Sequence, residues 1–393
     1  MHAMFALSQL DGPPQRPVPD EIASRARPGT APKPRPLVRA VLRAAAVVAP
    51  APTARALASR FLTPRRVRLE DRERSLIAAA ERIDLPFAAM RPGRGAHPRS
   101  VVAYLWGGDG PTVLLAHGWS SAAGQLAALI EPLRRLGFRV AAFDAPAHGA
   151  SGGTTTSAVE IAEVVLAAGR ILGPLHAVIG HSAGATAAAR AVAQGLPVGW
   201  LALVSPWTRP QIWVERFAAT FRLSRSMRAR LVRAVEGEVG ERLHAFDLEV
   251  IAPALANPTL VVHDRDDALV DVADVRAAVA ALPAGTLVET CGLGHSRILR
   301  ASEVVARVVE FVARDAADAP RRSAAGERAG RAVRSGGAIG RAADERQERR
   351  PASSAQAPLR LSVKGFTRSA VAGAVVVLGT WVALWGCFLA TLW

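Results

Sequence analysis

Short apolar runs alternate with longer amphipathic patterns along the middle of the chain, from residue 100 onward. The short runs, which predict buried strands, cover residues 101–106, 112–117, 139–144, 175–179, 200–205, 259–263 and 286–291. Patterns typical of helices lie between most of them, for example at 123–136, 157–172, 270–282 and 296–313. Continuous apolar strands joined by crossover helices predict an α/β fold, whose central sheet is mostly parallel and is covered by helices on both faces.

Polar residues gather where these predicted strands end. His117, Asp144, Ser182, Asp264 and His295 each lie at the end of a different strand or shortly after it. The carboxyl ends of parallel strands meet at one edge of the sheet, and chemistry in such folds collects beyond that edge. We therefore expect one site that draws its residues from several strand ends.

The motif GHSAG at 180–184 lies between an apolar run and an alanine-rich run at 185–193. This order predicts a strand, a sharp turn and a helix, which is the setting in which a G-x-S-x-G serine acts as a nucleophile. Taken alone, the motif also fits a serine that merely caps a helix. A base, an acid and an oxyanion hole at suitable places would decide for the nucleophile.

Residues 65–314 resemble the α/β-hydrolase superfamily. The resemblance rests on HGW at 117–119, DAPAHGAS at 144–151, GHSAG at 180–184, HDRDDALV at 263–270 and GLGH at 292–295. In that family the chain order is nucleophile, acid, histidine, and here it is matched by Ser182, Asp267 and His295. The resemblance also implies that the backbone N–H groups of Trp119 and Ala183 form the oxyanion hole.

The residues themselves favour His295 as the base, because it lies in a glycine-rich loop where neither strand nor helix periodicity gives it a packing role. An exposed loop histidine is the alternative. His181 is a poor base for Ser182, since adjacent side chains diverge. His117 and His148 follow other strands, and we expect them to make structural hydrogen bonds.

Three aspartates compete for the role of the acid: Asp264, Asp266 and Asp267. The family spacing H-G-x-x-D-x-x-V selects Asp267, with Asp264 standing where many members have glycine. The family's alternative position for the acid follows the strand at 200–205. Here that position holds Pro206 and Trp207, so it is rejected.

Residues 206–250 form a longer connection than usual between two strands, and the resemblance implies a cap over the site. The segment contains four aromatic residues, Trp207, Trp213, Phe217 and Phe221. They either line an apolar substrate pocket or pack the cap onto the domain, and the sequence does not choose. Cys291 is expected to be a small buried residue, without a catalytic role.

The formal net charge of +16 is concentrated in the two tails. Residues 1–68 carry a net charge of +9 and residues 320–393 a net charge of +8, which leaves the middle near neutrality. This distribution argues against nucleic acid as a partner of the folded domain. It suits tails near anionic lipid, although a genome bias toward arginine and alanine would produce the same excess.

Residues 370–393 contain no charged side chain. As a helix they would span about 36 Å, enough to cross a hydrocarbon core of about 30 Å. A transmembrane helix is therefore favoured over a buried core helix. Arg360, Lys364 and Arg368 precede it, which places the hydrolase domain on the cytoplasmic side.

Five segments follow: a disordered tail (1–36), a helical segment (37–64), a hydrolase domain (65–318), a flexible basic linker (319–368) and a transmembrane helix (369–393). Residues 37–62 are expected to form helices that pack on the domain or lie on a membrane surface. A signal peptide is the less favoured alternative, because Arg43, Pro50, Pro52 and Arg55 interrupt the apolar run. Cys291 lies in the domain and Cys387 in the final apolar segment, so no disulfide between them is expected, which fits a reducing compartment.

Together these features predict a serine hydrolase that cleaves a small acyl substrate (an ester, thioester or amide) near a membrane, with esterase or lipase-like activity favoured. No metal or organic cofactor is expected. The alternatives are a non-catalytic anchored binding or scaffold protein that retains the fold, or a peptidase of the same superfamily. Fold alone does not fix the substrate.

Overall fold

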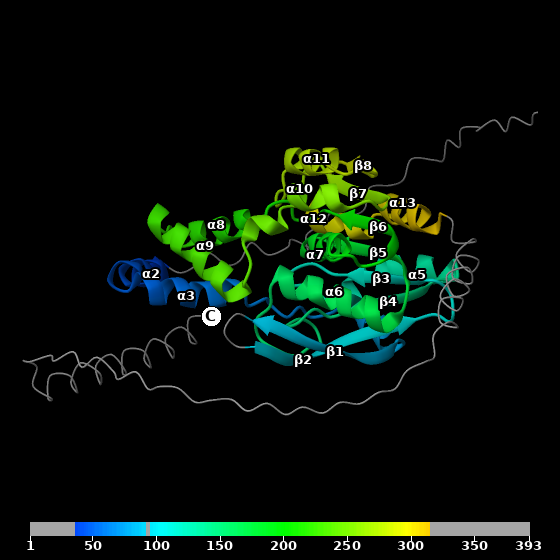
Figure 1. The fold of residues 1–393 in the computed structure, drawn as a ribbon, viewed down its shortest axis with the longest axis horizontal. Coiled ribbons are helices and arrows are strands. Elements are labelled where there is room, and N and C mark those ends of the chain that lie inside the picture. Colours follow the sequence, from blue (N-terminus) through cyan, green and yellow to red (C-terminus); the bar gives the residue numbers. More distant parts are fainter. Residues whose placement is uncertain (1–35, 92–94, 315–393) are drawn as a thin grey trace, which may run out of the picture. The chain divides into compact units, whose positions relative to one another are not determined.

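The protein is described here from a computed structural model, which covers residues 36–91 and 95–314 (Figure 1). Eight strands form one sheet in the order β1-β2-β4-β3-β5-β6-β7-β8. Their bounds are β1 (Glu81–Arg91), β2 (Gly95–Trp106), β3 (Thr112–Ala116), β4 (Arg139–Phe143), β5 (Leu175–His181), β6 (Val198–Val204), β7 (Thr259–Asp264) and β8 (Gly285–Thr290). Strands β3 to β8 pair in parallel, whereas β1–β2 and β2–β4 pair in antiparallel fashion. The prediction of a mostly parallel α/β sheet is confirmed.

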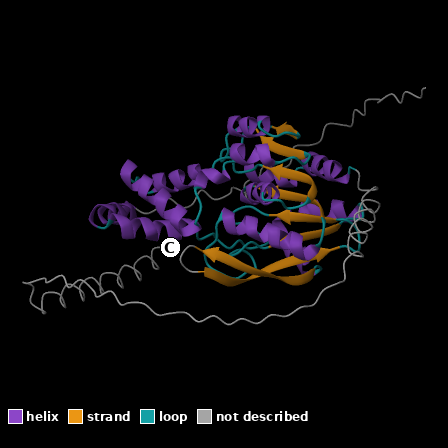
Figure 2. Cartoon of the chain, viewed as in Figure 1, coloured by secondary structure: helices purple, strands orange, loops and turns teal. Residues whose placement is uncertain are grey.

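Helices lie on both sides of this sheet (Figure 2). Their bounds are α2 (Pro36–Val48), α3 (Pro50–Phe61), α4 (Asp71–Ala78), α5 (Ala127–Arg135), α6 (Ala158–Leu172), α7 (Ala183–Ala193), α8 (Pro210–Thr220), α9 (Arg225–Val239), α10 (Leu248–Ile251), α11 (Val272–Ala280), α12 (Gly294–Arg297) and α13 (Ser302–Ala313). Short 3-10 turns occur at Ala123–Leu126, Leu243–Phe246, Ala252–Ala254 and Ile298–Arg300.

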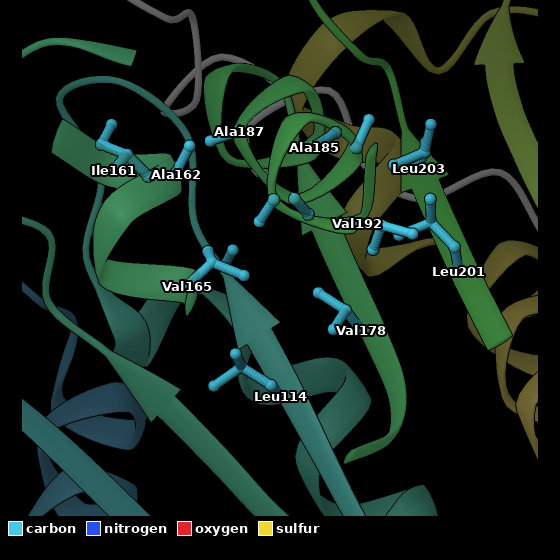
Figure 3. Close-up of a cluster of buried hydrophobic side chains, with 14 of the residues drawn as sticks. Leu114, Ile161, Ala162, Val165, Val178, Ala185, Ala187, Val192, Leu201 and Leu203 are labelled. Atoms are coloured by element: carbon cyan, nitrogen blue, oxygen red, sulfur yellow. The ribbon is translucent and has the colours of Figure 1, made fainter. Parts of the chain in front are cut away.

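Alternate residues of the central strands supply two separate cores, because successive side chains of a strand point to opposite faces. Leu114 and Val178 belong to the core under α6 and α7, whereas their neighbours Leu115 and Ile179 belong to the core under α5 and α13. Figure 3 shows the first of these cores, where strand side chains meet the small residues of α7. Both faces are apolar, which is why these strands appear as continuous apolar runs in the sequence.

The strand β1 was not predicted. Its sequence ERIDLPFAAMR contains charged residues and a proline, so it lacks the apolar run that marks the inner strands. It lies at the edge of the sheet and pairs only with β2, where such residues are tolerated. Leu85 is its buried core residue, and the half-buried Ile83 and Phe87 pack against the same core.

The segment 37–64 forms the helices α2 and α3, and α3 packs against α9 of the insertion (Figure 1). Thr53, Ala54, Leu57 and Ala58 are buried on α3, at the spacing of one helical face. Met227, Leu231 and Val235 form the buried stripe of α9. The N-terminal helices and the predicted cap therefore form one helical layer.

The predicted tail, linker and transmembrane helix, at 1–36, 319–368 and 369–393, lie outside the described residues except for Pro36. Within the described ranges, no helix has both the length and the apolar character needed to cross a membrane.

Candidate active site

Ser182 stands at the turn between β5 and α7, in a backbone conformation that residues other than glycine rarely adopt. Its φ is 54° and its ψ is −122°. Such a conformation costs of the order of 1–3 kcal/mol and persists where neighbouring structure holds it. The Ser182 N–H donates to Val204 O at 3.0 Å, and the Ala185 N–H donates to Ser182 O at 3.1 Å. The turn thus matches the strained elbow that lifts a nucleophilic serine above a sheet.

The two glycines of the motif are required by close backbone contacts. A Cβ on Gly180 would lie 2.4 Å from the Cα of Ala185, and one on Gly184 would lie 2.3 Å from the carbonyl oxygen of His117. Real Cβ atoms do not approach so closely. Small residues at both positions therefore let α7 start directly above β5 and beside β3.

The structure brings Ser182, His295 and Asp267 together as a hydrogen-bonded triad. Nε2 of His295 lies 2.9 Å from Oγ of Ser182, and Nδ1 of His295 lies 2.7 Å from Oδ2 of Asp267. All three residues are buried, with relative exposures of 5% for Ser182, 8% for Asp267 and 9% for His295. Because a carboxylate only accepts, Nδ1 carries the proton and Nε2 is left to accept from the serine hydroxyl.

The Asp267 carboxylate is held by more than the histidine. Its Oδ1 accepts hydrogen bonds from the N–H groups of Leu269, at 2.8 Å, and Val270, at 3.1 Å. Burial alone would raise the pKa of Asp267, but the hydrogen bond and charge of His295 together with these two amides lower it. The group is therefore an ionised acceptor at neutral pH, as an orienting acid requires.

The two rival aspartates do not bind the ring of His295 but hold residues 290–293, just before the short helix α12 on which His295 lies. Asp264 is fully buried, and its Oδ2 accepts from Thr290 Oγ1 at 2.7 Å and from the Leu293 N–H at 3.0 Å. Oδ2 of Asp266 accepts from the Gly292 N–H at 2.8 Å. Burial would raise the pKa of Asp264, yet its hydrogen bonds lower it overall. The spacing of the sequence did not indicate this anchoring role.

Two further histidines hold the triad, and neither role was predicted. Nε2 of His181 donates to the carbonyl oxygen of His295 at 2.9 Å, and burial lowers the pKa of His181 to about 3. Nε2 of His263 donates to Val270 O at 3.1 Å, and burial likewise lowers the pKa of His263. Both rings therefore stay neutral and act as fixed donors at neutral pH.

His117 and His148 make structural hydrogen bonds, as expected from the sequence. Nε2 of His117 accepts from the Ala145 N–H at 2.9 Å, and Nε2 of His148 accepts from the Ser120 N–H at 2.9 Å. Burial lowers the pKa of both, to about 3 for His148. Each ring therefore ties one strand-end loop to another.

The two amides expected at the oxyanion hole belong to Ala183, directly after the nucleophile, and to Trp119 of the HGW turn. Ala183 is the first residue of α7, so its N–H has no acceptor within the helix. Gly118 approaches Ser182 so closely that a Cβ on it would lie 3.0 Å from Ser182 Cβ. Trp119 follows Gly118 directly, which places the HGW turn beside the serine.

A chain of aromatic rings links this turn to the cap. The ring centroids of Trp119 and Trp207 lie 6.1 Å apart, and those of Trp207 and Trp213 lie 5.0 Å apart in a stacked arrangement. Phe217 of α8 contacts Phe61 of α3 at 5.5 Å. The cap aromatics thus pack on one another and reach the site, so packing and substrate contact are compatible roles.

The expectation that Cys291 is buried was wrong. Its side chain is exposed, and Sγ donates to Oδ2 of Asp266 at 3.2 Å. Cys291 follows β8, the edge strand of the sheet, whose residues are half-buried or exposed. An apolar-looking strand end therefore did not imply burial there. Across the described residues, no group of His, Cys, Asp or Glu side chains is arranged to hold a metal ion.

The sequence profile described as "Alpha/beta hydrolase family" matches residues 113–308, from β3 into α13. The chain belongs to the alpha/beta hydrolase family. It is accordingly a hydrolytic enzyme by family. The profile leaves out α2, α3 and the β1–β2 hairpin, so these are additions to the matched region.

Solved structures with a similar fold include an esterase of Pyrococcus furiosus, with 23% identity, 64% of this chain and 97% of that chain covered, and a TM-score of 0.49. A thioesterase domain from the curacin biosynthetic pathway has 20% identity, 60% and 99% coverage and a TM-score of 0.41. A membrane phospholipase A described as a bacterial virulence factor has 18% identity, 70% and 92% coverage and a TM-score of 0.43. No curated protein matches the chain in sequence. These distant likenesses carry no argument about substrate.

Proposed function

We propose that this alpha/beta hydrolase is a serine hydrolase that cleaves a carboxylic ester or thioester through an acyl-enzyme. The observation that carries the proposal is the pair of hydrogen bonds to His295, at 2.9 Å from Ser182 Oγ and at 2.7 Å from Asp267 Oδ2. A neutral serine hydroxyl is a weak nucleophile and needs such a base within hydrogen-bond reach.

In the first half of the reaction, Oγ of Ser182 attacks the substrate carbonyl carbon while its proton passes to Nε2 of His295. The carbonyl oxygen becomes an oxyanion, which the N–H groups of Ala183 and Trp119 stabilise. The proton on Nε2 then passes to the leaving alcohol or thiol as the bond to it breaks, and an acyl-Ser182 ester remains. Asp267 stays ionised and stabilises the imidazolium.

In the second half, water attacks the acyl carbon and gives its proton to Nε2 of His295. The second tetrahedral intermediate collapses, Ser182 Oγ takes the proton back, and a carboxylic acid leaves. Each half uses the same base and the same oxyanion site, so no further catalytic group is needed.

The aromatic rings near the serine favour an apolar acyl group over a charged peptide. Trp207 is almost fully buried, and its backbone N–H donates to the carbonyl oxygen of Ser182 at 3.4 Å. The ring of Trp119, from the HGW turn, lies against the ring of Trp207. Aromatic side chains bury large apolar areas. Esterase or lipase-like activity is therefore proposed ahead of amide or peptide hydrolysis.

We further propose that the domain is tethered to the cytoplasmic face of a membrane through residues 369–393. The uncharged run at 370–393 and the basic residues Arg360, Lys364 and Arg368 before it support this placement. The anchor would hold the site beside lipid, which agrees with an ester substrate of low polarity.

A labelled fluorophosphonate, which reacts only with activated serines, tests the catalytic proposal. Wild-type protein should be labelled, Ser182→Ala should not, and the exposed Ser302→Ala control should retain the label. Hydrolysis of p-nitrophenyl esters of increasing acyl length then defines the preferred chain. A wild-type protein that neither labels nor hydrolyses these esters would favour a non-catalytic binding protein.

Membrane fractionation tests the tether. The full chain should sediment with membranes and stay there after alkaline carbonate extraction, whereas a chain that ends at residue 365 should remain in the supernatant. If the full chain remained in the supernatant to the same extent as the shortened chain, the membrane part of the proposal would be refuted and the catalytic part would stand.

A further inference from the structure

Residues 61–66, from the last residue of α3 into the connection that leads to α4, lie against the loops around the nucleophile turn. We call residues 61–66 the N-terminal strap. The strap precedes the region matched by the family profile, which begins at residue 113. Its contacts nevertheless converge on Trp119 and Ser120, which belong to the turn that we propose as half of the oxyanion hole.

Ser120 is fixed from two directions. Its N–H donates to Nε2 of His148 at 2.9 Å, and its Oγ accepts from the Arg65 N–H of the strap at 2.9 Å. Ser120 has a φ of 51°, in the left-handed region that non-glycine residues seldom occupy. The Ser120 N–H belongs to the peptide bond that joins Trp119 to Ser120. Holding this N–H and the Ser120 side chain therefore restricts the orientation of the Trp119 backbone.

Arg66 holds the loop on which His148 lies. Its guanidinium donates to four backbone carbonyl oxygens of that loop: His148 at 3.2 Å, Gly149, Ser151 at 2.8 Å and Gly153 at 3.2 Å. The planar guanidinium carries five N–H donors in a fixed fork, so one side chain can bind several carbonyls at once. A lysine could not reproduce this set.

The first residue of the strap supports the turn through its ring. Phe61 stacks on Trp119 with centroids 6.5 Å apart, and Trp119 in turn meets His148 edge-on at 5.7 Å. Leu62 O accepts from the Thr156 N–H at 2.9 Å, which joins the strap to the start of α6. Ring contacts and hydrogen bonds thus brace the same two residues.

We propose that the N-terminal strap positions the Trp119 N–H of the oxyanion hole, with Arg66 as the positioning residue. Arg66 acts through the loop 148–153 and His148, and the Arg65 amide acts directly on Ser120. This inference rests on the proposed function. Oxyanion donors must lie 2.7–3.1 Å from the developing charge, and a misplacement of about 1 Å can cost about 10²-fold in rate.

The first test is the kinetics of Arg66→Ala on a p-nitrophenyl ester. We expect kcat to fall about 10- to 100-fold while KM changes by less than about twofold, because the lost contact matters only when the oxyanion forms. Arg66→Lys should recover little, whereas millimolar guanidinium added to Arg66→Ala should restore part of kcat. Arg68→Ala, an exposed arginine just beyond the strap, is the matched control and should behave like wild type.

Ser120→Gly is the second variant, in case Arg66→Ala unfolds. Glycine accepts the φ of 51° without strain but removes the hydroxyl that binds Arg65. We expect a several-fold loss of kcat and an unchanged KM. A loss that falls on KM alone, or an equal loss in Arg68→Ala, would overturn the proposal.

Amide hydrogen exchange separates this inference from the proposed function, because it needs no turnover. Arg66→Ala should speed exchange in residues 118–121 and 148–153 while α7 and the sheet stay protected. Unchanged exchange in both segments would refute the strap even in an active enzyme. Faster exchange in a protein that hydrolyses no ester would uphold the strap and reject the proposed function.

Discussion

Replacing Asp267 with asparagine should lower kcat by about 10⁴-fold with little change in stability. Asp267 Oδ2 accepts the Nδ1–H of His295 at 2.7 Å, and this bond keeps Nε2 free to accept the serine proton. An amide NH₂ at that position would favour the opposite tautomer, with Nε2 protonated and unable to act as a base. In a well-studied triad the same change costs about 10⁴ in kcat, which corresponds to about 5.5 kcal/mol in activation free energy.

The same substitution at Asp264 should act on stability instead. Asp264 Oδ2 accepts from Thr290 Oγ1 and the Leu293 N–H, and an amide there would face two donors. Two charge-assisted bonds lost in a fully buried site suggest about 2–4 kcal/mol of destabilisation, or a Tm lower by about 5–10 °C. We expect kcat of the folded fraction to stay within about tenfold of wild type, since the ring of His295 is not touched.

Asp266→Asn is the matched control, because Asp266 is exposed and binds only the backbone and Cys291 side chain of the loop. The assay is kcat on a p-nitrophenyl ester, alongside Tm by differential scanning fluorimetry for all three variants. An Asp267→Asn enzyme with kcat within tenfold of wild type would refute the assignment of the acid. A collapse of kcat in Asp264→Asn without loss of Tm would transfer the role to that residue.

Three other measurements probe the fold around the site. Gly184→Ala should destabilise the protein by about 1–3 kcal/mol and reduce fluorophosphonate labelling, because the Cβ of the new alanine would overlap the backbone of strand β3. An unchanged Tm together with unchanged labelling would contradict this steric argument. The pKa of His148 and of His181 is about 3 in the folded protein and near 6.5 in the unfolded chain. As the pH is lowered from 6.5, the unfolding free energy should therefore decrease by up to about 1.4 kcal/mol per pH unit for each histidine. A Tm at pH 5.5 equal to that at pH 7.5 would argue against this linkage. Burial and then the Asp144 charge raise the pKa of Tyr104, the single tyrosine of the chain, to about 12. Tyrosinate absorbance should therefore appear in the folded protein about two pH units higher than in the unfolded chain, and the unfolding free energy should fall as the pH rises from about 10 to about 12. Ionisation near pH 10 in the folded protein would contradict this expectation.

The inner part of the fold was predictable because each strand leaves a local mark. A strand buried on both faces needs consecutive apolar residues, and the turn after β5 needs glycine at 180 and 184 for reasons of space. Both requirements act on neighbours in the sequence. Edge positions impose weaker demands, which is why β1 escaped prediction and why Cys291, after β8, was wrongly expected to be buried.

The contacts of α2, α3 and the strap could not be predicted, because they join residues far apart in the chain. Arg66 bonds to residues more than 80 positions later, and nothing in its local pattern differs from Arg65 or Arg68. The same holds for His181, whose partner is His295. Local periodicity indicates which face of an element is buried but leaves open what lies against it.

The turn at 291–293 and the short helix α12, which carries His295, show how chain neighbours of a proposed catalytic group can take distinct positioning roles. His295 follows an edge strand and a glycine-rich turn, so its backbone has little intrinsic rigidity. Asp264 and Asp266 bind the turn just before it, and His181 binds its own carbonyl oxygen. Each of these three residues lies within three positions of Asp267 or Ser182 in the chain. A backbone segment that places a proposed catalytic side chain therefore also places the groups that hold its partner. The acids at 264–267 supply the proposed orienting acid, Asp267, and two residues that anchor the turn before His295.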